Sequence, residues 1–199
     1  MKLVLASNNA SKLREMRELL ADAGVEVLSQ REAGCDFEVE ETGSTFAENA
    51  WLKAAAVTKA TGLPAVADDS GLMVDALDGA PGIYSARFTG SHADSDEARN
   101  RYLLERLKGV ENRRAKFVSC VCCTFPDGTV LRSRGECHGS IGYAPKGSGG
   151  FGYDPLFWTD DVPGKTTAEL DPAEKNRISH RGRAFRAFKE ELIKYYAHQ

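Results

Sequence analysis

The chain has 199 residues, of which 42% are hydrophobic, so it can bury a sizeable core, and we expect one compact domain over residues 1–199. Its 26 basic and 29 acidic residues leave a net charge of -3, which supplies no global positive field to hold a nucleic-acid backbone. No stretch approaches the roughly 18 apolar residues that span a bilayer, and the apolar run after Lys2 is too short for a signal peptide. These features predict a cytoplasmic protein that binds neither nucleic acid nor a membrane.

The first part of the chain alternates strand and helix patterns. Residues 2–6 form a short apolar run that predicts a buried strand, and an amphipathic helix follows and ends at Gly24. Residues 25–28 begin a second extended segment. An acidic loop over residues 38–43 then leads to the next helix.

That next helix has clear start and stop signals. Thr45 and Glu48 form a T-x-x-E capping box at its start, and Gly62 with the proline after it ends the helix. The apolar strand at residues 64–67 then delivers the sequence D-D-S-G, residues 68–71, at its C-terminal end. Ligand sites gather at such strand ends in open α/β sheets.

The middle of the chain predicts a helix and a hairpin. A Gly/Pro-rich loop at residues 79–88 precedes a charged helix over residues 95–108. Alternating strands at 115–125 and 129–137 flank a Pro-Asp-Gly turn, a hairpin signal. The Gly-rich segment 147–154 is another loop.

The last helical region begins at Asp171 and Pro172, a cap residue and an N1 proline. We expect Gly182 to divide it into two pieces that end near Tyr196. The whole pattern predicts a mixed α/β fold.

Three of the five cysteines cluster at Cys120, Cys122 and Cys123, which is not a disulfide framework. Cys120 and Cys123 have C-x-x-C spacing, but on a strand they would face opposite sides. Buried structural cysteines are therefore favoured over zinc or redox chemistry.

A polar turn, Ser7-Asn8-Asn9-Ala10-Ser11-Lys12, leaves the first strand and enters the first helix. Free backbone N–H groups and the helix dipole favour an anion at such a place, and Lys12 suits a phosphate. The turn lacks the G-x-x-x-x-G-K-[ST] pattern of a Walker A loop, so an ordinary capped helix start is the alternative.

Two acidic pairs are candidate metal ligands: Glu40-Glu41 before the long helix and Asp68-Asp69 after the strand. Mg²⁺ commonly takes one or two carboxylates together with substrate phosphates and waters. A solvated turn is the alternative for the second pair. Lys53 shares a helix face with the asparagine four residues before it, and a solvated lysine is the alternative there.

Two later segments offer contacts to a base. In the sequence G-G-F-G-Y-D-P the glycines let the backbone approach a ligand, and Phe151 offers a ring for stacking, a contact worth about 1–3 kcal/mol. A packed aromatic turn is the alternative. Lys175, His180 and Arg181 supply polar donors, whereas the other nearby cations are expected on a solvated helix surface.

Six motifs follow one another along the chain: S-N-N-A-S-K, E-E-T-G-x-T-F-x-E-N-A-x-x-K-A, A-D-D-S-G-L-x-V-D, G-A-P-G-I-Y-S-A-R, G-G-F-G-Y-D-P and A-E-K-N-x-I-S-H-R-G. In this order they closely resemble the inosine triphosphate pyrophosphatase family, the house-cleaning dITP/XTP pyrophosphatases. The resemblance runs from Leu3 to about Arg186. It implies an elongated mixed β-sheet flanked by helices, two lobes with the active-site cleft between them, and a homodimer.

The resemblance also implies residue roles. Residues 7–12 resemble the triphosphate-binding turn, Asp69 the catalytic carboxylate and metal ligand, and Glu40 the other metal ligand, although Glu41 could exchange roles with it. Lys53 is expected close to the phosphates, in a catalytic role. The other expected substrate contacts are Ser70, Phe151, Gly152, Tyr153, Asp154, Lys175, His180 and Arg181.

The implied activity is Mg²⁺-dependent hydrolysis of ITP, dITP and XTP to monophosphate and diphosphate. Asp69 or a metal-bound water would provide the base for attack on the α-phosphorus. Lys12, Lys53 and Lys175 would neutralise charge on the phosphate oxygens. The sequence leaves open the ranking of the substrates and the choice between Mg²⁺ and Mn²⁺.

Base selectivity is expected from the 151–154 backbone and from His180 and Arg181, whose donors would meet the 6-oxo group of hypoxanthine or xanthine. Adenine carries a 6-amino donor there instead, and guanine would be rejected at its 2-amino group. One alternative is a nucleotide-binding regulator or nucleic-acid-binding module without hydrolysis, against which the paired carboxylates argue. Another is a related pyrophosphatase for pyrimidine or modified nucleotides.

Overall fold

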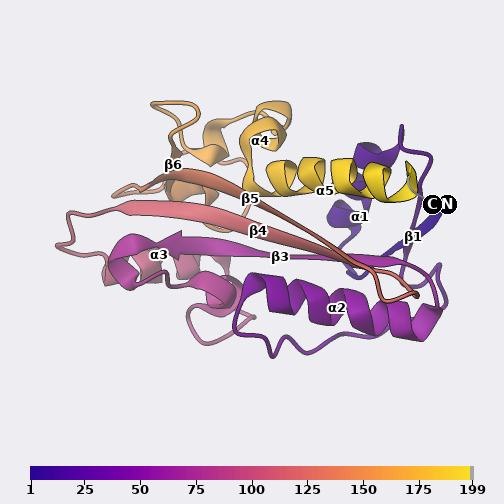
Figure 1. Ribbon diagram of the computed structural model, residues 1–199. Helices are drawn as coiled ribbons and strands as arrows, with labels where there is room; N and C mark the ends of the chain where they lie inside the picture. The colour runs from indigo at the N-terminus through magenta and orange to yellow at the C-terminus, as the bar shows by residue number, and fades with distance from the viewer. Residues whose placement is uncertain (198–199) are drawn as a thin grey trace. The chain divides into compact units, whose positions relative to one another are not determined.

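The computed structural model describes residues 1–197, apart from the side chain of Ser11. Six strands form a mixed sheet in the order β2-β1-β3-β4-β5-β6, with flanking helices (Figure 1). The strands are β1 (Lys2–Leu5), β2 (Glu26–Ser29), β3 (Ala65–Val74), β4 (Arg114–Thr124), β5 (Val130–Ile141) and β6 (Phe157–Thr159). The α-helices are α1 (Ala10–Leu20), α2 (Phe46–Thr61), α3 (Asp96–Arg106), α4 (Pro172–Ile178) and α5 (His180–Ala197), and the 3-10 helices are η1 (Asp75–Leu77), η2 (Gly82–Arg87), η3 (Asp154–Leu156) and η4 (Thr167–Glu169). The predicted mixed α/β class is confirmed.

The chain divides into two compact units. Unit 1 contains Met1–Asp69, Ser119–Gly135 and Arg183–Gln199, and unit 2 contains Ser70–Val118 and Glu136–Gly182. Strands β3, β4 and β5 therefore contribute residues to both units. The expectation of a single domain over the whole chain stays a prediction. In the part of the chain that the structure describes, no helix is long and apolar enough to cross a membrane.

Unit 1 is built on parallel strands covered on both faces. β1 pairs in parallel with β2 and with β3. Alternate residues of β1 face opposite sides: Leu3 and Leu5 pack in one apolar cluster with Met16 of α1 and Phe188 of α5, and Val4 belongs to the cluster that includes α2. Figure 1 accordingly shows α2 and α5 on opposite sides of these strands.

Unit 2 has its own apolar core. Leu103 and Leu107, from the C-terminal end of α3, are fully buried together with Leu72 of β3 and Phe157 of β6. Ser95 begins α3 as its N-cap, because its hydroxyl accepts the Ala98 N–H at 3.2 Å. The predicted helix over 95–108 is thus confirmed, and its first turn is fixed in place.

The capping box predicted at the start of α2 is confirmed. Thr45 Oγ1 accepts the N–H of Glu48 at 3.1 Å, and the Glu48 carboxylate accepts the N–H of Thr45 at 3.2 Å. Gly62 ends the helix in the left-handed conformation, with φ of 67°. Local contacts therefore fix where α2 begins and ends.

Strand β3 extends beyond the expected residues 64–67, so D-D-S-G lies within the strand and not at its end, and the alternative of a solvated turn is wrong. Asp68 and Asp69 lie inside the strand, which continues because Leu72 and Val74 beyond them are fully buried. The neighbouring β1 ends earlier, where Leu5 pairs with Val66 of β3. The two aspartates therefore come just past the carboxyl end of a parallel neighbour, where ligand sites gather.

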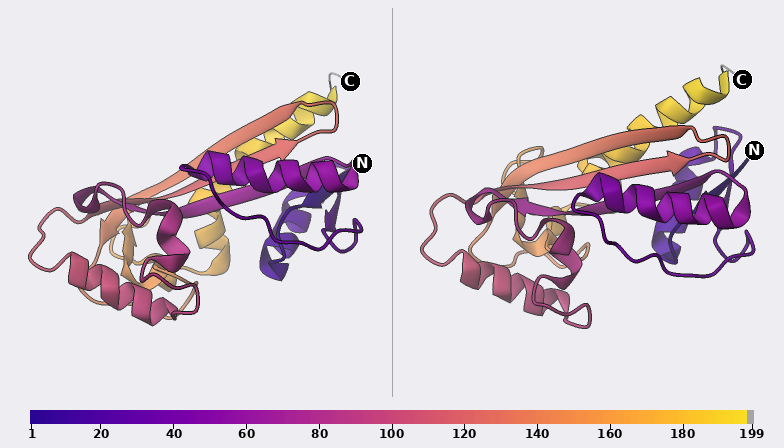
Figure 2. Two further views of the ribbon diagram at one scale, coloured as in Figure 1. Left: turned by 90° about the horizontal axis from the view of Figure 1, so that it is seen from below. Right: turned by 60° about the horizontal axis from the view of Figure 1, so that its bottom comes forward.

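The predicted hairpin and the buried cysteines are confirmed. The Phe125 N–H donates to the Thr129 carbonyl at 3.0 Å across the turn between β4 and β5, and Figure 2 shows the two strands running side by side into it. Cys120, Cys122 and Cys123 of β4 are buried thiols and not part of disulfides. Burial raises the pKa of Cys122 to about 11, as expected for an unreactive thiol.

The break in the C-terminal helices lies at Ser179, so the expectation that Gly182 divides them is wrong. Ser179 has extended backbone angles, φ −63° and ψ 152°, between α4 and α5. Its hydroxyl accepts the Gly182 N–H at 3.0 Å, which caps α5. Gly182 lies within α5, where a Cβ atom would collide with the backbone carbonyl of Asn176. Its role is close approach, not helix breaking.

Gly182→Ala is therefore expected to destabilise the protein by about 1–3 kcal/mol through this overpacking. Helix propensity alone predicts the opposite sign, because alanine is favoured over glycine inside a helix by about 0.5–1 kcal/mol. Ala187→Gly, in the same helix, measures that propensity as a control. Urea unfolding followed by circular dichroism gives both values, and a stabilised Gly182→Ala variant would contradict the assignment.

Candidate active site

The polar turn between β1 and α1 is held by its own side chains. Ser7 Oγ accepts the N–H of Asn9 at 3.2 Å, and Asn9 Oδ1 accepts the N–H of Lys12 at 3.1 Å, so Asn9 caps α1. Residues 8–10 are exposed, and the first amides of a helix have no intrahelical acceptor. The geometry suits an anion, whose binding stays a prediction. The side chain of Ser11 lies outside the described part of the chain.

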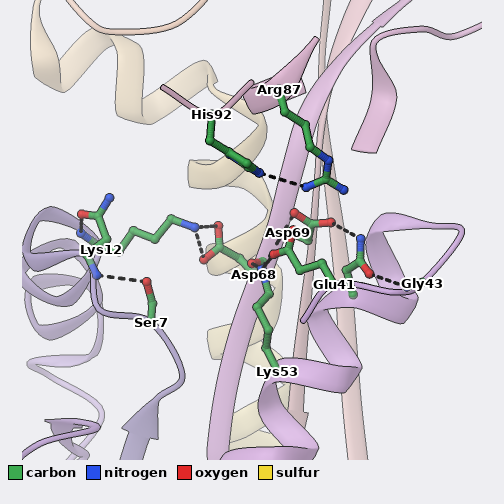
Figure 3. Close-up of polar contacts among 11 residues, drawn as sticks. Ser7, Lys12, Glu41, Gly43, Lys53, Asp68, Asp69, Arg87 and His92 are labelled. Atoms are coloured by element: carbon green, nitrogen blue, oxygen red, sulfur yellow. Dashed lines mark hydrogen bonds and ion pairs between the residues drawn. The ribbon is translucent and has the colours of Figure 1, made fainter. Parts of the chain in front are cut away.

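Lys12 reaches from α1 to β3 (Figure 3). Its Nζ lies 2.9 Å from both carboxylate oxygens of Asp68, a residue only 2% exposed. A buried carboxylate needs such a partner. Asp68 therefore acts as the counter-charge that fixes Lys12 beside the polar turn.

Asp69, the next residue of β3, points to the opposite face, toward α2. Asn49 Nδ2 donates to its Oδ2 at 3.1 Å, and Lys53 Nζ lies 3.8 Å from its Oδ1. Burial raises the pKa of Asp69; Lys53 and Asn49 oppose this effect, and the carboxylates of Glu41 and Asp68 add to it. The result is a carboxylate whose negative charge is incompletely balanced.

Lys53 is not a solvated lysine, so that alternative is wrong. Its side chain is 16% exposed, and its Nζ donates to Glu41 Oε1 at 2.7 Å and to the carbonyl of Asp68 at 2.8 Å. Figure 3 shows the side chain rising from α2 between these partners. Lys53 thus ties the acidic loop to β3 and shares a helix face with Asn49, as the spacing predicts.

Of the two adjacent glutamates, the structure brings Glu41 to this cluster, whereas Glu40 is exposed. The loop is held against α2 because Asn49 Oδ1 accepts the N–H of Gly43 at 2.8 Å. A Cβ atom on Gly43 would collide with the Asn49 side chain, so glycine is required for this approach. Asn49 thus positions both the loop and Asp69, a role that its motif contained but that we did not assign.

The donor set fits a hard divalent cation. Glu41 and Asp69 offer carboxylate oxygens around one ammonium group, with negative charge left over at Asp69. Among residues 1–197, no cluster of three or more His, Cys, Asp or Glu side chains is arranged to hold a metal. Mg²⁺ suits two carboxylates because it completes its shell with phosphates and waters.

In unit 2, the segment around Phe151 forms a tight loop organised by Asp154. Asp154 is 4% exposed and accepts the Phe151 N–H at 2.9 Å, the Thr167 hydroxyl at 2.8 Å and the Lys175 ammonium. A Cβ atom on Gly150 would collide with its carboxylate. Phe151 is 67% exposed, and Lys175 Nζ lies 4.7 Å from its ring centroid. The Phe151 ring is therefore exposed and not packed into the turn, and its stacking on a base stays a prediction.

The other residues expected to contact the base differ in their burial and in their partners. Tyr153 is buried and its hydroxyl donates to the Ser85 carbonyl at 2.8 Å, while burial raises its pKa. The His180 ring stacks on Phe117 with centroids 4.9 Å apart. Arg181, in the first turn of α5, is half-buried. Substrate binding by these residues stays a prediction.

Each unit therefore assembles one group of the predicted residues. Unit 1 contains the turn 7–12, Lys53 and Asp69, and unit 2 contains the 151–154 loop, with the other expected base contacts and Ser70. Sequence reasoning missed Asp68 as the partner of Lys12, and it missed the side chains that hold the loop. Those partners come from distant segments and carry no local signal.

Comparisons with known proteins agree over nearly the whole length. A family model described as the Ham1 family matches residues 3–191. A dITP/XTP pyrophosphatase of Exiguobacterium is 49% identical over 195 residues, 98% of each chain. One of Thermus thermophilus is 51% identical over 192 residues, 96% of this chain and 91% of the relative.

Solved structures show the same fold. The Ham1 protein of Staphylococcus aureus is 42% identical with a TM-score of 0.91, over 98% of this chain and 100% of that one. A HAM1 protein of Coxiella burnetii is 43% identical with a TM-score of 0.91, over 98% and 99% of the two chains. The resemblance inferred from the motifs is confirmed.

The two adjacent aspartates are expected to respond oppositely to neutralisation in metal-free buffer. Asp69→Asn should raise the melting temperature, because it removes an incompletely balanced charge and keeps an acceptor for Asn49. Asp68→Asn should destabilise by about 1.5–3 kcal/mol, because Lys12 loses a charged partner. Calorimetry with EDTA measures both, and a lower melting temperature for Asp69→Asn would contradict the charge assignment.

Proposed function

The chain belongs to the Ham1 family, and on this premise we propose that it hydrolyses the non-standard purine nucleoside triphosphates ITP, dITP and XTP to monophosphate and diphosphate. The enzyme is a nucleoside triphosphate pyrophosphatase that clears such nucleotides from the pool. The observation that carries the proposal is the half-buried Asp69, held by Asn49 beside Lys53 and Glu41.

We propose that Mg²⁺ is held by Asp69 and by Glu41, where the resemblance had favoured Glu40. Glu41 and Asp69 both contact the ammonium of Lys53, so their carboxylates belong to one cluster. Bound there, the ion supplies positive charge against the phosphate oxygens of the substrate.

The triphosphate is bound by the turn 7–12, whose backbone amides and Lys12 offer donors to anionic oxygens. The Lys12 ammonium is held in position by its hydrogen bond to the Asp68 carboxylate. Lys53 adds a second fixed positive charge. Both ammonium groups are pre-positioned by carboxylates, so little reorganisation is needed when the phosphates arrive.

Asp69 acts as the general base. It takes a proton from the attacking water as the water oxygen bonds to the α-phosphorus, and the bond to the departing diphosphate breaks. Its backbone is fixed because Lys53 donates to the carbonyl just before it.

The base is recognised by unit 2. It stacks on the exposed ring of Phe151, and donors of His180, Arg181 and the 151–154 backbone meet its 6-oxo group. The ring of His180 is kept in one plane by Phe117. Adenine would place its 6-amino donor against these donors and is rejected.

The remaining parts of the proposal are a homodimer, as the resemblance implies, and a cytoplasmic place of action on free nucleotides. Small-molecule substrates, without nucleic acid or membrane, agree with the net charge of -3. Light scattering of the purified chain tests the dimer, and a monomer at assay concentration would contradict it.

A substrate panel tests the activity. Diphosphate release is measured for ITP, dITP, XTP, ATP, GTP, dUTP and dTTP with Mg²⁺ or Mn²⁺. We expect kcat/KM for ITP and XTP to exceed that for ATP by about 100-fold or more, because a mismatched hydrogen-bonding edge is strongly rejected. Equal turnover of ATP and ITP would refute the substrate class, and activity confined to pyrimidines would favour the related pyrophosphatases.

The adjacent glutamates give a matched pair of variants for the catalytic residues. Glu41→Gln and Asp69→Asn should each lower kcat for ITP by about 100-fold or more, as expected for groups that act on the transition state. Glu40→Gln removes the same charge one residue away and should stay within about threefold of the parent. A large loss of kcat in Glu40→Gln, with little loss in Glu41→Gln, would show that Glu40 holds the metal instead of Glu41. Near-normal hydrolysis by Asp69→Asn would exclude Asp69 as the base.

A further inference from the structure

Side chains of helix α3 form hydrogen bonds with both the N–H and the carbonyl of Gly152, which lies in the 151–154 loop. Asp96 Oδ2 accepts the Gly152 N–H at 2.6 Å, and Asn100 Nδ2 donates to the Gly152 carbonyl at 3.0 Å. Asp96 and Asn100 are four residues apart, so they share one face of the helix. Neither belongs to the motifs that carry the family resemblance.

The side chains of Asp96 and Asn100 are themselves held in position by neighbouring residues. The guanidinium of Arg99 pairs with Asp96 and donates to the carbonyl of Ala86 at 3.2 Å. Burial would raise the pKa of Asp96, but the Gly152 N–H and Arg99 outweigh burial and lower it. Asn100 is only 6% exposed. These side chains are anchored parts of unit 2 and not a solvated helix surface.

The loop has already used most of its backbone donors. The Phe151 N–H goes to Asp154 Oδ2 at 2.9 Å, the Gly152 N–H to Asp96, and the Asp154 N–H to the Phe151 carbonyl at 3.3 Å. Within residues 1–197 the contacts give the Tyr153 N–H no acceptor. Tyr153 N–H is therefore the donor of the loop that is left for a ligand.

Asn100 controls where that donor points. The Gly152 carbonyl and the Tyr153 N–H belong to the same peptide group, and in a trans peptide they point in opposite directions. Because Asn100 holds the carbonyl against α3, the N–H points away from α3. Gly152 has φ of 62° and no Cβ atom, so it offers little resistance to rotation of this peptide. Tyr153, with φ of −90°, opposes a full turn because its φ would become positive.

We propose that Asn100, with Asp96, is a specificity-determining positioning residue: by holding the Gly152 carbonyl against α3 it presents the Tyr153 N–H as the donor for the 6-oxo group of the base. This inference rests on the proposed function. If the peptide group between Gly152 and Tyr153 turned over, it would present the Gly152 carbonyl to the base in place of the Tyr153 N–H. This carbonyl is an acceptor that complements the 6-amino group of adenine. The orientation of one peptide thus decides which purine edge is matched.

Asn100→Asp tests the orientation directly. A carboxylate cannot donate to the Gly152 carbonyl but accepts the Tyr153 N–H, so the variant favours the flipped peptide. We expect the ratio of kcat/KM for ITP to that for ATP to fall by about tenfold or more, with an absolute rise for ATP. Asn112→Asp, an exposed change of the same kind in unit 2, should leave the ratio unchanged.

A second pair of variants covers the case in which Asn100→Asp does not fold. Asp96→Asn weakens the grip on the Gly152 N–H, whereas Glu97→Gln removes an exposed charge from the same helical turn. The first should lower the ITP to ATP ratio and the second should not. Thermal melting of all four variants is compared with the parent, so that lost folding is distinguished from altered selectivity.

Binding of the products IMP and AMP, measured by calorimetry, separates this inference from the proposed function. If the parent does not hydrolyse ITP, the proposed function fails, but the IMP to AMP binding ratio still reports on Asn100. A ratio that falls in Asn100→Asp, with a shift of the Tyr153 amide resonance when IMP binds the parent, supports the inference. Equal losses for both ligands, an unchanged ratio, or a Tyr153 amide insensitive to IMP would overturn it.

Discussion

Two adjacent carboxylates inside a buried strand are the constraint on which the candidate active site depends. Asp68 and Asp69 project to opposite faces of β3, so one ammonium group cannot serve both. Helix α1 supplies Lys12 to the first and α2 supplies Lys53 to the second. Each helix is thus joined to the strand by charge as well as by apolar packing. As a result, the polar turn before α1 and the acidic loop before α2 are both brought to one short stretch of β3.

The fold could be predicted from the sequence wherever a few neighbouring residues decide the local structure. The capping box at Thr45 and the terminating Gly62 are such cases, because their partners lie within one helical turn. The prediction failed at residues 68–71, since acidic residues are typical of turns and only the buried apolar residues beyond them keep the strand going. It failed again at Gly182, whose need for close approach to Asn176 depends on how two helices meet and not on helix propensity.

The site was predictable in its residue types but not in its pairings. The motifs pointed to Lys12 and the acidic residues, yet Asp68 serves as the counter-charge of Lys12. Glu41 contacts Lys53 whereas the adjacent Glu40 is exposed, and this difference comes from loop geometry. Contacts of side chains with distant backbone groups leave no periodicity or spacing in the sequence, so no pattern could have shown that helix α3 holds Gly152.

The cation above the Phe151 ring bears on which molecules can use that ring. The Lys175 ammonium, held by the buried Asp154, lies 4.7 Å from the ring centroid and covers one face. A single face is left for a base. A purine within a nucleic-acid strand is stacked on both sides and would have to leave a neighbour, whereas the base of a free nucleotide has both faces open. The stacking that we propose on Phe151 therefore suits the base of a free nucleotide better than a base held within a strand.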